Sequence, residues 1–145
     1  MTFRIATLND CPLLAELNHQ LAEDEGHRNR FMTVPQLEER MRGFLSTQYR
    51  AVIFEEGGKV VAHALYREDS DEIYLRQLFV VRGRRRQGFG RKAVEILRAQ
   101  IWPTGKRLTV DVLVGNLGAI AFWRSVGYKD YYLALEILPD RPASS

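Results

Sequence analysis

The chain has 145 residues, 46% of them hydrophobic, which is enough to bury one core and too few for two ordinary domains. Its single cysteine, Cys11, excludes an internal disulfide and a cysteine-based zinc cluster, and a chain with so little cysteine is typical of a reducing compartment. The net charge is +3, no apolar run approaches the roughly 20 residues that span a bilayer, and the polar first residues do not resemble a signal peptide. We therefore expect one domain over residues 1–140, a frayed tail over 141–145, a cytoplasmic location and no membrane partner.

The first part of the chain predicts a strand followed by two helices. Residues 2–6 alternate apolar and polar side chains, as a strand does, and Asp10 is placed to cap a helix with leucines at helical spacing. A polar break over 23–30 separates this helix from a second one. Thr33 and Gln36 have the spacing of a capping box at the start of the second helix.

The middle of the chain predicts three strands and a helix. Strands over 51–54 and 60–66 flank a pair of glycines that suits a hairpin turn. The run 73–81 has the strongest strand pattern, and an amphipathic helix over 88–101 follows it.

The last part predicts a strand over 108–114, a short helix over 116–126 and a final strand over 128–137. With the earlier elements this order indicates an α+β fold. We expect a mixed, mostly antiparallel central sheet with helices on both faces and one βαβ crossover.

A cationic, glycine-punctuated loop, Arg84–Gly90, joins the third of these strands to the next helix. Residues 82 to 92 carry six positive charges and no acid, so the rest of the chain sums to −3 (+3 minus 6). Glycines let the backbone approach a ligand closely, and unpaired amides at a helix start attract anions. A single strongly cationic segment in an otherwise mildly acidic chain suits a compact phosphorylated ligand better than a nucleic-acid backbone.

Two other interpretations of this loop stay open. Gly88-x-Gly90-x-x-Ala93, with Asp111 downstream, matches a dinucleotide fingerprint, although six residues separate the first glycine from the preceding strand, which is too many for that fold. The cluster over 82–92 also suits a non-enzymatic nucleic-acid- or nucleotide-binding module. Such a module would bind with a steep salt dependence.

Two motifs in the expected order resemble a known family. Arg85-x-x-Gly88-x-Gly90, preceded by Leu78–Val80 and followed by an amphipathic helix, resembles the acetyl-CoA signature of the GNAT superfamily of N-acetyltransferases. Residues 116–128, Asn-x-x-Ala-x-x-Phe-Trp-x-x-x-Gly-Tyr, resemble the second signature of that family. The resemblance implies an enzyme that moves the acetyl group of acetyl-CoA to a primary amine by direct attack.

By this resemblance, the strand and the loop bind acetyl-CoA. The strand backbone would bond the pantetheine arm where two strands splay apart, and an amide near Val80 would polarise the thioester carbonyl. The amides from Arg86 to Arg91 would hold the pyrophosphate, with arginine side chains adding charge-assisted contacts. The implied cofactor-binding residues are Leu78, Phe79, Val80, Arg85, Arg86, Gln87, Gly88, Phe89, Gly90, Arg91, Asn116 and Trp123.

Two of these residues have alternative roles. Asn116 would reach the pantetheine or serve as a plain helix cap. Trp123 stands where the signature usually has the tyrosine that protonates the departing sulfur, and an indole N–H is far too weak an acid for that task. Trp123 would pack on the thioester arm or belong to the core. Water, Tyr128, Tyr131 or Tyr132 would then supply the proton.

Asp111 is the candidate general base. It interrupts an otherwise apolar strand five positions before Asn116, where the resemblance implies an acidic base in some members of the family. A half-buried carboxylate at this position would have a raised pKa, which helps it accept a proton from the amine. The alternative is an outward-facing polar residue in an alternating strand.

The acceptor is indicated only by a short acidic run. Glu23, Asp24 and Glu25 end the first helix, in the region that usually roofs the acceptor site of the family, and would attract a cationic amine or form an ordinary solvated charge run. We expect the acceptor to be a small-molecule or peptide amine, and polyamines, amino acids, antibiotics and protein amino termini all remain possible acceptors. A homodimer is also possible. No metal site is expected, because the three histidines lack ligand spacing, and no nucleic-acid partner is expected.

Overall fold

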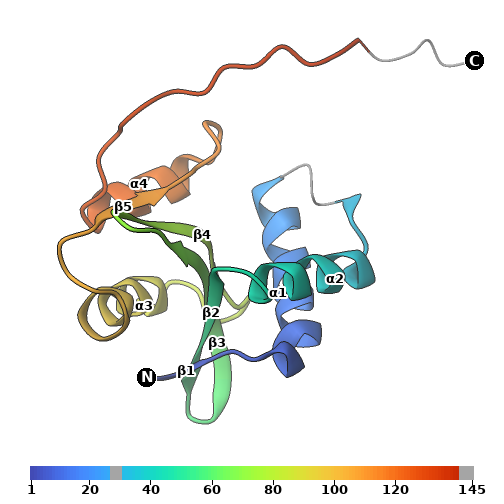
Figure 1. The fold of residues 1–145 in the computed structure, drawn as a ribbon, viewed down its shortest axis with the longest axis vertical. Helices are drawn as coiled ribbons and strands as arrows, with labels where there is room; N and C mark the ends of the chain where they lie inside the picture. The colour runs from blue at the N-terminus through green and yellow to red at the C-terminus, as the bar shows by residue number, and fades with distance from the viewer. Residues whose placement is uncertain (27–30, 141–145) are drawn as a thin grey trace, which may run out of the picture.

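The computed structural model of the chain describes residues 1–26 and 31–140. The predicted frayed tail over 141–145 and the end of the polar break over 27–30 lie outside the described residues. The centre of the fold is a five-stranded sheet (Figure 1). In spatial order its strands are β1 (Thr2–Ile5), β2 (Tyr49–Glu56), β3 (Lys59–Glu68), β4 (Glu72–Val80) and β5 (Arg107–Val110).

Strands β1 to β4 are antiparallel neighbours, and β5 pairs parallel with β4. Four α-helices surround the sheet, with a short 3-10 turn before α1 and a π-helical turn that continues α3. These elements are η1 (Leu8–Asp10), α1 (Cys11–Glu25), α2 (Val34–Leu45), α3 (Phe89–Ile96), η3 (Leu97–Ile101) and α4 (Leu117–Ser125). Helices α1 and α2 lie on one side of the sheet and α3 on the other (Figure 1). The predicted fold class is confirmed.

Local signals explain where the first two helices begin. The amide of Gln36 donates to Thr33 Oγ1 at 3.3 Å and the amide of Thr33 donates to Gln36 Oε1 at 2.9 Å, so the predicted capping box is confirmed. Asp10 is the N-cap residue of α1, as predicted, but its side chain does not form the cap hydrogen bond. Its carboxylate accepts from the amide of Thr7 at 2.8 Å and from the guanidinium of Arg4 at 3.0 Å, and makes no cap bond to α1.

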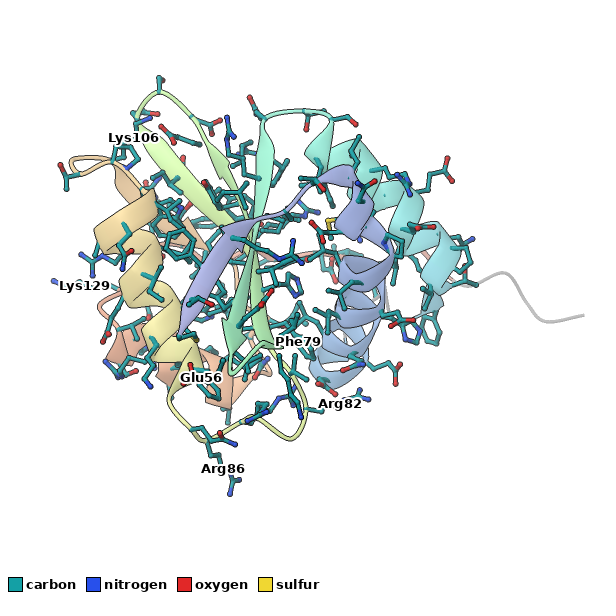
Figure 2. The ribbon with its side chains drawn as sticks, turned by 90° about the horizontal axis from the view of Figure 1, so that it is seen from below. Glu56, Phe79, Arg82, Arg86, Lys106 and Lys129 are labelled. Atoms are coloured by element: carbon teal, nitrogen blue, oxygen red, sulfur yellow. The ribbon has the colours of Figure 1, made fainter. Side chains whose placement is uncertain are left out.

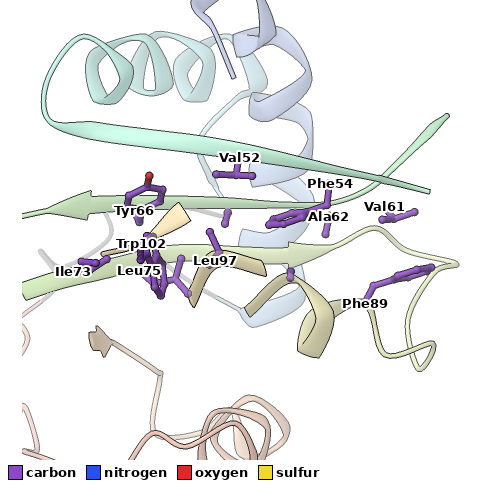
Figure 3. Packing of buried hydrophobic residues seen from close by; sticks show 12 residues of the cluster. Val52, Phe54, Val61, Ala62, Tyr66, Ile73, Leu75, Phe89, Leu97 and Trp102 are labelled. Atoms are coloured by element: carbon purple, nitrogen blue, oxygen red, sulfur yellow. The ribbon is translucent and has the colours of Figure 1, made fainter. Parts of the chain in front are cut away.

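Two apolar cores form, one on each face of the sheet. The core under α1 and α2 comprises Cys11, Leu14, Met41, Tyr49, Ala51, Ile53 and Leu65. The core under α3 is larger, and Figure 3 shows its side chains from β2, β3 and β4 packed against those of α3 and η3. Phe54 and Leu97 are fully buried in it, and burying a side chain of this size contributes about 1.5–3 kcal/mol. The two cores hold the sheet between its helices.

The last two predicted strands differ from the structure. The strand predicted over 108–114 ends at Val110, because the next residues have no strand neighbour and the amide of Asn116 donates to Leu113 in a turn. The strand predicted over 128–137 is absent. After Tyr128 the chain runs away from the sheet in an extended line (Figure 1). A strand needs a neighbouring edge to bond, and this segment has none among the described residues.

Strand β4 carries a bulge close to its middle. Leu65 of β3 pairs with Gln77, whereas the next residue, Tyr66, pairs with Leu75, so Arg76 has no partner in β3. A bulge of this kind re-aims the side chain of the extra residue. Arg76 and Gln77 therefore point toward the same face of the sheet, the face covered by α1 and α2.

Candidate functional site

Strands β4 and β5 separate at the bulge. They pair over four positions, from Glu72 with Arg107 to Leu75 with Val110, and beyond Leu75 strand β4 is bonded only to β3. One edge of β4 is therefore open from residue 76 to residue 80.

The open edge presents the backbone groups of two residues. The amide of Val81 donates to the carbonyl of Val61 on β3 at 2.8 Å. Alternate residues of an antiparallel strand turn both polar groups to the same neighbour, so the groups of Leu78 and Val80 face the open edge. The carbonyl of Val80 accepts one bond there, from Arg85 Nε at 3.2 Å. The remaining groups can bond an extended ligand as a further strand would.

The start of α3 lies at the end of this edge. None of the amides from residue 86 to residue 91 donates to another described residue. Gly88 caps the helix with φ +79°, and Arg86 has φ +62°, a left-handed conformation that is uncommon for a residue with a side chain. Six free amides at a helix start form an anion-binding cradle, and they fit the pyrophosphate of a CoA thioester.

The arginines of the loop point in two directions. Arg82 and Arg85 both bind the carboxylate of Asp24 at the end of α1, at 2.9 and 2.5 Å, and the Arg85 guanidinium also covers the ring of Phe79 at 5.2 Å. Figure 2 shows Arg82 beside α1 and Arg86 pointing outward from the loop. The side chain of Arg85 therefore fastens the loop to α1, which differs from the expected phosphate contact.

The acidic run at the end of α1 is largely occupied by these contacts. The two arginines hold the pKa of Asp24 below its usual range against the opposing effect of its burial. Glu23 Oε1 lies 2.8 Å from His19 Nδ1, and its other oxygen lies 3.8 Å from Arg82. Burial raises the pKa of Glu25. Of the three acids, only Glu25 has no described ion pair.

Asp111 lies one residue beyond β5 and is exposed, so the expected half-buried position in mid-strand is wrong. Its carboxylate is held from the neighbouring strand, because Tyr74 Oη donates to Asp111 Oδ2 at 2.8 Å. Burial and this hydrogen bond raise the pKa of Tyr74, so its hydroxyl stays protonated and keeps donating. The pair sits where β4 and β5 begin to diverge.

Helix α4 carries the remaining predicted residues. Asn116 Oδ1 accepts from the amide of Ala119 at 3.1 Å, so the cap is formed. Trp123 packs against the core under α3 and stacks edge-on with Tyr128, with ring centroids 5.3 Å apart. The Tyr128 hydroxyl is buried without a described partner, and burial raises its pKa to about 12. The rings of Tyr131 and Tyr132 lie in the exposed tail.

An open groove of about 620 Å³ runs between α3 and the end of α4. It begins at Arg91, whose guanidinium donates to Ser125 at 3.0 Å, and Arg98 lies further along it. Arg91 is also the last of the residues at the start of α3 whose amides are free. The lining of the groove has two cations, Arg91 and Arg98, and one acid, Glu95. The size of the groove and its net positive charge suit the nucleotide end of a large anionic ligand.

The sequence did not single out a cationic aromatic cluster on the α2 face. The guanidinium of Arg76 lies 4.9 Å from the ring centre of Phe44, and that of Arg40 on α2 lies 5.1 Å from it. Arg76 Nη1 also donates to the hydroxyl of Tyr49 at 3.4 Å. Arginines are common on surfaces, so their pattern gave no signal, and only the bulge in β4 brings Arg76 to this place.

Buried hydrogen bonds between side chains hold the bulge on the side of the sheet that faces α1. His63 Nε2 donates to Gln77 Oε1 at 3.2 Å, and Gln77 Nε2 donates to Asn18 Oδ1 on α1. Burial lowers the pKa of His63 to about 4, so the ring is neutral at pH 7. His63 therefore has a structural role. These hydrogen bonds tie β3, β4 and α1 together beside the open edge.

Comparisons with solved structures support the fold. A structure described as a possible acetyltransferase from Clostridium difficile 630 superposes with a TM-score of 0.76 at 22% identity, covering 97% of this chain and 98% of that one. An aminoglycoside acetyltransferase from an uncultured soil metagenomic sample, in complex with sisomicin, gives 0.72 at 16% identity with 97% and 96% coverage. An aminoglycoside N-acetyltransferase in complex with CoA gives 0.74 at 12% identity with 95% and 93% coverage. The comparison with curated proteins gives no match.

A family model described as "Acetyltransferase (GNAT) family" matches residues 14–128, which is most of the chain. The matched region includes the open edge of β4, the loop, α3 and the whole of α4. The chain belongs to the GNAT family of acetyltransferases and is an acetyl-CoA-dependent N-acetyltransferase.

Proposed function

We propose that the open edge of β4 and the start of α3 together bind acetyl-CoA. The observation that carries this assignment is that two sets of free backbone groups follow one another along the chain. The groups of Leu78 and the amide of Val80 face the open edge, and the free amides of residues 86–91 come next. The first would bond the pantetheine arm and orient the thioester carbonyl, and the second would hold the pyrophosphate. The groove from Arg91 to Arg98 would receive the nucleotide end.

Thermal unfolding with and without acetyl-CoA tests this assignment. A ligand that binds only the folded state at 100 times its Kd stabilises that state by about 2.7 kcal/mol. We expect acetyl-CoA to raise the Tm, NADH and an oligonucleotide to leave it unchanged, and release of free CoA thiol on addition of an amine. A Tm raised by the oligonucleotide alone would instead favour the nucleic-acid-binding module.

For the chemical step we propose Asp111 as general base, acting on the acceptor amine directly or through one water. Tyr74 would position it, since the hydroxyl holds one carboxylate oxygen at 2.8 Å and leaves the other for the amine. The amine would then attack the acetyl carbonyl in one displacement without an acetylated enzyme. The burial of Cys11, the only cysteine, supports this, because its thiol is shielded from any thioester.

We also propose a homodimer in which each copy supplies its C-terminal segment to the other. Large apolar side chains of this segment are exposed, namely Tyr131, Tyr132, Leu133, Leu135, Ile137 and Leu138. An ion pair between Arg124 and Asp130 at 2.7 Å and the stacking of Arg107 on Tyr131 at 4.5 Å hold the start of the segment against α4 and β5, and the rest of it runs away from the fold (Figure 1). The outer edge of β5 has no strand neighbour among the described residues. The β5 edge of a second copy would give the segment a strand to pair with. If each copy gives its segment to the other, the backbone groups of both segments and both edges are hydrogen-bonded.

The remaining parts of the proposal concern location and partners. No helix among the described residues has the length and apolar character needed to cross a bilayer. We propose a cytoplasmic enzyme, in keeping with its free, buried Cys11. We propose that the acceptor is a small molecule or peptide with a primary amine and that nucleic acid is not a partner, because two arginines of the cationic loop are already paired with Asp24.

A further inference from the structure

Two arginines on the acceptor side of the site have no ion-pair partner among the described residues. Arg40 is partly exposed and Arg76 is exposed, and neither forms an ion pair with a described residue. Their neighbour Arg67 differs, because it binds Asp69 at 3.2 Å. Burial and the charge of Arg76 both lower the pKa of Arg40. Two guanidiniums on one aromatic ring, neither paired with a described acid, are available to bind an anion together.

The fold holds both guanidiniums in place. They lie against the Phe44 ring at 5.1 and 4.9 Å, and Tyr49 Oη accepts from Arg76 at 3.4 Å. The ring of Tyr49 lies 4.8 Å from that of Phe44. Stacked guanidiniums lose little freedom when they bind, and their planar forks match the oxygens of a carboxylate or phosphate.

The position of Arg76 connects this cluster to the proposed reaction. Arg76 lies two residues after Tyr74, which holds Asp111, and two residues before Leu78 on the open edge. At about 3.3 Å per residue, its backbone is roughly 7 Å from each. A small molecule with an amine and an acid group can therefore present the first to Asp111 while the second reaches Arg76.

We propose that Arg40 and Arg76 bind an anionic group, a carboxylate or a phosphate, on the acceptor. The inference rests on the proposed acetyl-CoA site and names the class of acceptor: a small primary amine that also carries an acid. The inference excludes polycations such as aminoglycosides as acceptors, because the two arginines would repel them. The acidic run at the end of α1 does not counter this, since Asp24 and Glu23 are already paired.

Matched acceptors test the inference. Leucine with leucinamide, and O-phosphoethanolamine with ethanolamine, share an amine and differ in the anionic group. We expect kcat/KM for the acid-bearing member of one pair to exceed that of its neutral partner by at least about tenfold, corresponding to one charge-assisted contact. The pair that shows the preference distinguishes carboxylate from phosphate. Spermidine, a polycation, is expected to be the poorest acceptor.

The variants Arg40→Gln and Arg76→Gln connect the preference to the cluster. Each is expected to raise KM for the preferred acceptor about tenfold, leaving kcat and the KM of the neutral partner nearly unchanged. Arg50→Gln is the control, because Arg50 is exposed on β2 and has no described ion pair. Acetyl-CoA binding is measured on the same samples by the Tm shift. If acetyl-CoA binds and neutral amines react as well as acidic ones, the inference is wrong; if acetyl-CoA does not bind, the proposed site itself fails.

Discussion

The Arg85 guanidinium, in the loop before α3, lies 2.5 Å from the carboxylate of Asp24 at the end of α1. This contact joins the proposed acetyl-CoA loop to the helix that borders the acceptor side. Arg82 binds the same carboxylate at 2.9 Å, so one acid orients two arginines of the loop.

The variant Asp24→Asn is therefore expected to weaken acetyl-CoA binding about threefold by loosening the loop, with little change in Tm, since exposed ion pairs contribute about 0–1 kcal/mol. Calorimetric titration with acetyl-CoA measures the change. Glu23→Gln is the matched control, because Glu23 lies 3.8 Å from Arg82 and does not pair with Arg85. Equal affinities of wild type and Asp24→Asn would show that the contact does not order the loop.

A valine at Gly88 is expected to abolish acetyl-CoA binding, because its side chain would stand in front of the amides that receive the pyrophosphate. The backbone has φ +79°, so the substitution also strains the loop by about 1–3 kcal/mol. Gly83→Val separates the two effects, since Gly83 has φ +86° in the same loop but precedes the free amides. We expect similar losses in Tm and loss of binding in Gly88→Val alone. Equal binding losses in both would mean that strain, and not position, is responsible.

The variants Asp111→Asn and Tyr74→Phe test the proposed base. Asp111→Asn is expected to reduce kcat about a hundredfold near neutral pH and less at high pH, where the free amine no longer needs a base. Tyr74→Phe keeps the carboxylate and loses only its 2.8 Å hydrogen bond, so a smaller loss of about tenfold is expected. The measurement is kcat/KM across pH. A ratio of high-pH to neutral rates equal to that of wild type in Asp111→Asn would remove Asp111 from this role.

The buried His63 predicts a loss of stability in acid. Its folded pKa is about 4, below the unfolded value of about 6.5, so only the unfolded state gains the proton as the pH falls between these values. The free energy of unfolding should therefore drop by up to about 3 kcal/mol from pH 7 to pH 4 through this residue. His63→Gln keeps a donor for Gln77 and should show a shallower pH dependence in urea unfolding. Parallel curves for the two proteins would contradict the assignment.

The exposed C-terminal segment predicts a dimer. Alternation along an extended chain puts Leu133, Leu135 and Ile137 on one side and Ala134 on the other. Leu135→Glu is expected to yield monomers by light scattering, whereas Ala134→Glu should stay dimeric. A monomeric wild type would contradict the proposed dimer.

The sequence predicted those parts of the fold that depend on local patterns. The Thr33 capping box and the strand over 73–81 depend on neighbouring residues, and both are found in the structure. The end of β5 and the course of the chain after Tyr128 depend on which edge is free to pair, and no periodicity contains that information.

The candidate site shows the same division. The glycines and arginines of the loop could be identified from their spacing, because a helix start is a local feature. The hydrogen bond between Tyr74 and Asp111 joins residues 37 positions apart, and the stacking of Arg76 on Phe44 depends on a single unpaired residue. Such contacts appear only when the strands are in register.

Arg76, the extra residue of the bulge, could be deleted without changing how the rest of β4 faces its neighbours. The ladder on either side of it would be continuous if Arg76 were deleted, since Leu75 and Gln77 already face opposite sides of the sheet as adjacent strand residues do. No buried side chain would have to change sides. Deleting Arg76 is therefore expected to leave both cores in place and to remove the guanidinium that stacks on Phe44.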